Sequence, residues 1–380
     1  MDNLTTKNQA KREWAIASCD TLISLDLLNS EEQNKFADGL YQQTDKFGLP
    51  EKSIYYRFAY LNLPKPQDVD TLANFKKYIY TETFPIRGKE NGFSLLGGKI
   101  SLLDEIAGAS RPHINIWGQD DIKYFAHKLI EWWDTDKQWV EQEKNEPKER
   151  YLFFGGDKEF NLRFNEVVKI LSSVVLPKLD NNEQAIILEL TRIIVGMEEL
   201  GINTLKAEAA FCDLKPESVD IVLNKIETNM LSCDIEVQRD ALLAIPVMLK
   251  TQSGKEYQTD LTEMLGQFIT WNNTNMLTQA LWVVIDIVKN NPQSFTSNLD
   301  KKVQNRLLRL LTETNPSTQE LNIEFEFKIN LRSCAVRLAS ALKDYYSLKN
   351  MTIPNVVNDW FDISKSDIEF SEVRNAWEKY

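Results

Sequence analysis

The sequence has few of the residues on which most catalytic sites depend. Its 380 residues include two histidines, His113 and His127, which do not have the i, i+4 spacing that places two metal ligands on one helical face. The four cysteines occur singly, with no CxxC pair: Cys19, Cys212, Cys233 and Cys334. Neither a zinc site nor a histidine-based hydrolase triad is expected, and the cysteines are predicted to be buried free thiols.

Glycine and proline are also scarce, at 14 and 12 residues, too few for a fibrous or disordered chain. Residues 1–14 (MDNLTTKNQAKREW) lack the apolar core of a secretory signal. The longest apolar run, residues 280–288, is interrupted by Asp286 and falls short of the roughly 18 residues of a membrane span. We therefore expect no membrane segment and a location in the reducing cytoplasm.

Phosphate-binding loops are missing as well. The GGK sequence at 97–99 lacks the spacing of a nucleotide-binding loop, and no GxGxxG occurs. The GGD sequence at 155–157 ends in a negative charge, which suits a turn better than a phosphate. The sequence thus predicts no catalytic residue, no cofactor-binding residue and no metal ligand, and indicates that the protein is not an enzyme.

The net charge of −12 opposes non-specific binding to nucleic acid or anionic lipid, although it leaves room for a local basic groove. Hydrophobic residues make up 43 %, enough for a packed core, and charged residues an ordinary 26 %. A folded protein with protein partners fits this composition better than a nucleic-acid-binding one.

The second half of the chain contains a pattern that returns about every forty residues, in which one amphipathic helix follows another. The first helices of the pairs are expected at 216–230, 260–271 and 299–311, and the second helices at 235–249, 276–289 and 331–342. Pro246 should kink or shorten the helix that contains it. Since such a hairpin cannot bury its apolar face alone, the pattern predicts a HEAT-like α-solenoid of stacked hairpins.

The fold class is therefore all-α, with an N-terminal helical domain before the array. That domain is expected over 1–145, with a helix from 30 that is stopped by Gly48-Leu49-Pro50, further helices at 69–80 and 120–140, and an irregular glycine-rich segment at 84–118. Asn29 or Ser30 should cap the first of these helices. The polar run 141–150 (EQEKNEPKER) indicates a domain boundary or an exposed loop, and the array should occupy 150–380, with a C-terminal cap from 351.

Tryptophan offers the best candidates for contact with a partner. Trp132, Trp133 and Trp139 give the 120–140 helix two aromatic faces, so it is either buried on both or offers one to a partner. Since aromatic anchors dominate interface energy, Trp133, Trp360 and Trp377 are the predicted partner contacts. Core packing is the competing interpretation for the tryptophans of the 120–140 helix.

Two other functions remain open. Glu324, Glu326 and Lys328 form an ExExK pattern that, on a strand, could hold magnesium in a metal-dependent nuclease. Separately, one helical face could contact phosphates of a nucleic acid through Lys302, Arg306 and Arg309. The structural alternatives are an insertion or a helix start for the first pattern and a solvated, ion-paired face for the second.

Four segments resemble the helical C-terminal regions of large bacterial sirtuin-domain proteins that act in defence against phages. They are residues 12–14 (REW), 45–50 (DKFGLP), 61–64 (LNLP) and 367–377 (DIEFSEVRNAW). Nothing in the chain resembles the NAD-hydrolysing sirtuin domain itself. The resemblance therefore implies a helical platform that senses a foreign protein or holds an enzyme subunit. We expect a non-catalytic protein-binding scaffold, sensor or regulatory subunit.

Overall fold

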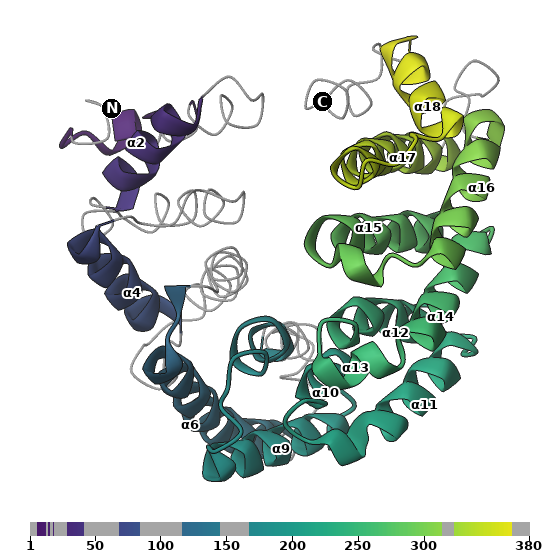
Figure 1. Ribbon diagram of the computed structural model, residues 1–380. Helices are drawn as coiled ribbons and strands as arrows, with labels where there is room; N and C mark the ends of the chain where they lie inside the picture. Colours follow the sequence, from purple (N-terminus) through teal and green to yellow (C-terminus); the bar gives the residue numbers. More distant parts are fainter. Residues whose placement is uncertain are drawn as a thin grey trace. The chain divides into compact units, whose positions relative to one another are not determined.

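The computed structural model describes residues 6–12, 14–15, 18, 29–41, 68–83, 116–144, 167–313 and 323–366. All regular structure in these ranges is helical, which confirms the predicted all-α class (Figure 1). The chain divides into two compact units, Met1–Ala207 and Glu208–Tyr380, here called unit 1 and unit 2.

Unit 1 contains the N-terminal helices, of which α2 begins with the predicted cap. The side chain of Asn29 accepts a hydrogen bond from the Glu32 backbone N–H at 3.0 Å, and the Glu32 carboxylate accepts one from the Asn29 N–H at 3.0 Å. This reciprocal pair satisfies two backbone donors that the first turn would otherwise leave open. Among the described residues of this unit, the helices include α2 (Ser30–Tyr41), α4 (Val69–Thr83), α6 (Gln119–Lys144), the π-helical turn η4 (Leu171–Val175) and α9 (Gln184–Glu199).

Helices α6 and α9 pack against each other inside unit 1, through a large residue opposite a small one. A Cβ atom added at Gly196 of α9 would lie 2.5 Å from Cζ2 of Trp133, so only glycine leaves room for the indole ring. This packing joins residues on both sides of the boundary expected at 145–150. The two compact units instead divide between Ala207 and Glu208, where α10 (Leu205–Phe211) runs across the division.

Unit 2 is a stack of helical hairpins in two layers (Figure 1). Neighbouring helices of the second layer contact one another, as do the last three helices of the first layer, and each hairpin joins the layers. The first layer holds α11 (Val219–Met230), α14 (Gln258–Thr270), α16 (Ser297–Glu313) and α18 (Asn355–Ser366). The second holds α12 (Ile235–Met248), α15 (Thr274–Asn290) and α17 (Ile323–Leu348). Three short helices lie between them, η5 (Pro216–Ser218), α13 (Gln252–Glu256) and η6 (Pro292–Ser294).

Two details of the second layer differ from the sequence pattern. Helix α17 begins at Ile323, well before the expected start at 331. Its first two turns occupy the sequence IEFEFKIN, whose alternation of apolar and polar residues is typical of a strand. Pro246 lies inside α12, which continues past it and ends at Met248.

Polar side chains fasten successive hairpins of unit 2 together. The buried Asn291 amide donates to the Leu249 carbonyl at 3.0 Å and so joins the carboxyl ends of α15 and α12. The Asp213 carboxylate accepts from the backbone N–H groups of Gln252 and Ser253, each at 2.8 Å, at the start of α13. These bonds pair backbone groups that the helix ends leave without intrahelical partners.

The cysteines bear out the predicted buried thiols in part. Cys212 and Cys334 are buried in unit 2, and burial raises the pKa of the Cys212 thiol to about 11. Burial raises the pKa of Cys334 as well. Cys233, in the turn between α11 and α12, is exposed, contrary to prediction, and Cys19 lies outside the described residues.

Candidate partner surface

Two of the three predicted partner contacts lie in the core, which does not fit their predicted role. Trp133 is 1 % exposed and Trp360 is 0 % exposed. The Trp360 indole donates its N–H to the Leu307 carbonyl at 3.1 Å, so α18 is fixed onto α16. For Trp133 the competing interpretation, core packing, is correct. Trp377 lies outside the described residues.

The predicted phosphate-binding face on α16 is not a row of open cations. Arg306 is 5 % exposed, its guanidinium lies 3.4 Å from the Trp271 carbonyl and from Glu313, and burial lowers its pKa. Arg309 is exposed but pairs with the same Glu313 carboxylate at 2.9 Å. The stem of Lys302 lies over Gly266, where a Cβ would come within 2.5 Å of its Cδ. Both arginines have Glu313 as an ion-pair partner, but only Arg309 lies on a solvated face, because Arg306 is buried.

The nuclease alternative required Glu324, Glu326 and Lys328 on a strand. The backbone over 323–330 is helical, so the strand is absent from the segment where the pattern occurs. The side chains of these three residues lie outside the described part of the structure. Across the described ranges, no group of three or more His, Cys, Asp or Glu residues is placed to hold a metal ion.

An exposed tryptophan that the sequence analysis did not select lies near the middle of the second layer. Trp282 of α15 is 46 % exposed, although Ala280, Leu281 and Val283 beside it are buried. Helical periodicity places Trp282 on one face with Gln279, Asp286 and Lys289, all polar. A large aromatic ring on a polar face is costly to leave in water, and it is a typical anchor for a partner.

Arg337 of α17 lies over this ring, with its guanidinium carbon 5.6 Å from the centroid of Trp282. The side chain is half-buried. Within the described residues, Arg337 has no hydrogen bond and no carboxylate at ion-pair distance. Arg192, Arg239 and Arg309, by contrast, each pair with a carboxylate on their own helix. Arg337 is therefore held in place by stacking, while its N–H donors stay open.

The surroundings of this pair combine apolar and charged groups. Lys250, just past α12, bonds Asp286 of α15 at 2.8 Å. One and two turns before Lys250 on the same face lie Val247 and Leu243, both half-buried. We call this set the Trp282 surface: Leu243, Val247, Lys250, Trp282, Asp286 and Arg337. It crosses the second layer from α12 to α17.

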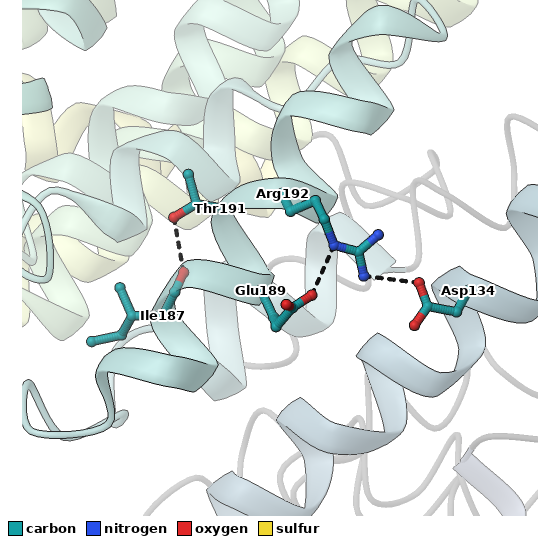
Figure 2. Close-up of polar contacts among 5 residues, drawn as sticks. All are labelled: Asp134, Ile187, Glu189, Thr191 and Arg192. Carbon is teal, nitrogen blue, oxygen red and sulfur yellow. Dashed lines mark hydrogen bonds and ion pairs between the residues drawn. The ribbon is translucent and has the colours of Figure 1, made fainter.

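Unit 1 also has exposed apolar side chains beside an arginine. Leu188 and Val195 of α9 are both exposed, one turn to each side of Arg192. Figure 2 shows the Arg192 guanidinium between Asp134 of α6, at 2.8 Å, and Glu189, at 2.7 Å. Hydrogen bonds to Asp134 and then to Glu189 raise the pKa of Arg192. Because this arginine already has two carboxylate partners, it offers a partner protein less than Arg337 does.

The sequence does contain a signal for Trp282. It stands within the apolar run 280–288, but helical periodicity assigns it to the face of Asp286 and Lys289 instead of the core face. Trp360 carries no such signal, because the segment that buries it comes from distant parts of the chain. Arg337 could be paired with Trp282 only once the register of α15 against α17 was known.

Comparison with known proteins adds little to this geometry. No protein-family model and no curated protein matches the chain. One similar solved structure, described as an engineered protein, has 11 % sequence identity and a TM-score of 0.30, and covers 99 % of this chain and 96 % of its own. A second engineered protein has 11 % identity and a TM-score of 0.27, with 81 % and 97 % covered. At these scores the likeness supports no argument about fold or function.

No helix in the described ranges combines the length and the apolar character that crossing a membrane requires.

Proposed function

We propose that this protein is a non-catalytic protein-binding scaffold, sensor or regulatory subunit, and that unit 2 is a HEAT-like array that binds its partner through the Trp282 surface. The single observation that supports this most directly is the half-exposed Trp282 under a stacked arginine. Tryptophan and arginine are the residues most enriched among those that dominate interface energy. A row of parallel helices also presents a broad face, which suits a protein partner.

The partner is an enzyme subunit or a foreign protein, and the setting is bacterial antiviral defence in the cytoplasm. This part of the proposal rests on the resemblance of residues 12–14, 45–50, 61–64 and 367–377 to the helical regions of sirtuin-domain defence proteins. Most of those residues lie outside the described ranges. In this role the chain binds the partner protein and catalyses no reaction itself.

The test is affinity capture from the native host with the full chain, followed by reconstitution with the purified partner. Trp282→Ala should weaken binding of that partner by at least about 30-fold, the loss of roughly 2 kcal/mol that defines a dominant contact. Leu308→Ala is the matched control, because Leu308 is an exposed apolar residue on α16 of the first layer. If the two variants bind alike, or if the purified chain alone hydrolyses a nucleotide or cleaves DNA, the proposal fails.

A further inference from the structure

We infer that the Trp282 surface recognises an acidic segment of the partner protein, in which a carboxylate binds the open N–H donors of Arg337. This inference rests on the proposed function, since it names the chemistry of the partner at the same surface. It assigns a role to each residue of the pair. Arg337 binds a carboxylate of the partner, and Trp282 orients Arg337 and contacts the apolar part of the bound segment.

The guanidinium N–H donors of Arg337, which have no hydrogen-bond partner among the described residues, are the first reason to expect a bound carboxylate. A guanidinium presents five N–H groups in a fixed fork that matches the two oxygens of a carboxylate. Three other described arginines of unit 2 satisfy part of their N–H donors with a carboxylate of the chain: Arg239 with Glu236, and both Arg306 and Arg309 with Glu313. Arg337 stacks on Trp282 instead, which leaves its fork available to a ligand.

Stacking also prepares Arg337 for binding. An exposed arginine loses much rotamer freedom when it grips a ligand, and that loss weakens affinity. The ring of Trp282 already restricts the guanidinium 5.6 Å from its centroid, so less freedom remains to be lost. The part of the indole still open to solvent gives a leucine or phenylalanine of the partner a surface against which to bury itself.

The charges around the pair favour carboxylates on a protein over the phosphates of a nucleic acid. Lys250 is already paired with Asp286, which leaves Arg337 as the unpaired cation of the Trp282 surface. Nucleic-acid affinity depends on many simultaneous phosphate contacts, whereas one fork can bind one carboxylate well.

The experiment uses the full chain and a fluorescein-labelled synthetic peptide in which glutamates alternate with leucines, measured by fluorescence anisotropy at low salt. A second peptide has glutamine in place of every glutamate. The glutamate peptide should bind at least about tenfold more tightly, since a hydrogen bond to a charged group is worth more than one to a neutral amide. Arg337→Gln should remove that preference, and Arg337→Lys should retain part of it.

The matched control is Arg309→Gln, which removes an exposed arginine already paired with Glu313. It should bind both peptides as the unaltered chain does. Circular dichroism and a thermal melt establish that each variant is folded. The inference is overturned if the glutamate peptide does not bind, if Arg337→Gln keeps the preference, or if a phosphopeptide or an oligonucleotide binds more tightly at Arg337 than the glutamate peptide.

Failure of this inference can be told apart from failure of the proposed function. With the captured native partner, loss of binding in Trp282→Ala but not in Arg337→Gln would leave the scaffold function standing and remove the carboxylate. Unchanged binding in both variants would contradict the proposed function and the carboxylate inference together. Loss in both, with a partner whose binding also depends on its own Asp or Glu residues, is the result we expect.

Discussion

Helix α17 carries two arginines, each stacked on a tryptophan from another helix, with opposite surroundings. Arg332 lies 5.3 Å from the ring of Trp360, and both side chains are buried. Arg337 lies 5.6 Å from the ring of Trp282, which is half-exposed. The two pairs share their residue types and almost their geometry. Coverage by α18, which packs on α16 and α17, distinguishes the inner pair from the outer one.

The comparison shows that burial, more than residue type, decides what such a pair does. In the buried pair, the ring of Trp360 fills space in the core, and its cation–π contact with Arg332 is stronger because water is excluded. Outside, the same contact is weak as a source of stability but keeps an arginine oriented toward solvent. The inner pair should therefore govern unfolding of unit 2, and the outer pair should govern binding.

Trp360→Ala should have the largest effect, because it empties the space that joins α18 to α16. Truncating a fully buried tryptophan costs about 3–5 kcal/mol of the free energy of unfolding. Urea denaturation followed by circular dichroism measures it, with Asp359→Ala, an exposed neighbour on the same helix, as the control. A smaller loss than that of Trp282→Ala would reverse the comparison between the two pairs.

Asn291→Ala extends the comparison to hydrogen bonds, with the next largest effect. It leaves the buried Leu249 carbonyl without its 3.0 Å partner, at a cost of about 1–3 kcal/mol. The preceding residue provides the control, since Asn290 donates to Asp286 in an exposed position. Asn290→Ala should change the free energy of unfolding by less than about 0.5 kcal/mol. Equal effects in a denaturant titration would show that burial is not what separates the two bonds.

Trp282→Ala and Arg337→Ala test the outer pair directly. Arg337→Ala should lower the free energy of unfolding by no more than about 1 kcal/mol, the range for an exposed cation–π contact, and Trp282→Ala, which also removes the buried half of the ring, by about 1–3 kcal/mol. Binding of the reconstituted partner should nevertheless fall sharply in both. Thermal melts and titrations on the same preparations give the two quantities. A marked fall in melting temperature with unchanged binding would make this pair structural, like Arg332 with Trp360.

Lys250→Ala and Asp286→Ala should have the smallest effects. Their side chains are 49 % and 36 % exposed, and a surface ion pair of this kind contributes about 0–0.5 kcal/mol. A double-mutant cycle in low and high salt measures the coupling, which salt should reduce further. A coupling above about 1 kcal/mol would mean that this contact, although exposed, holds α12 to α15.

The hairpins of unit 2 could be predicted from sequence because their causes are local. The second helix of one pair was expected at 276–289 and is α15 (Thr274–Asn290). Apolar residues at helical spacing set its buried face, and the Asn291–Pro292 pair ends it. The same reasoning placed α12 correctly to within one residue at each end. Periodicity and chain-breaking residues act within a few turns, so no knowledge of the rest of the fold was needed.

Trp133 and Trp360, two of the predicted partner contacts, are buried by packing whose causes are long-range in the sequence. Trp360 would look equally suited to an interface or a core until α18 is placed against Leu307. The compact units divide after Ala207 and not near the expected 145–150 for a similar reason, since Trp133 and Gly196 are far apart in sequence and meet only when α6 packs on α9. For residues 323–330 the local pattern favoured a strand, and the continuous helix α17 overrode it.

Each hairpin of unit 2 is fastened mainly to the ones just before and after it, by packing and by bonds such as that of Asn291 to Leu249. A whole hairpin can therefore be added or lost between two others without redesign of the remainder. Related chains could bind partners of different size by adding hairpins to this stack. Each added hairpin would contribute its own exposed side chains to the continuous surface of the stack.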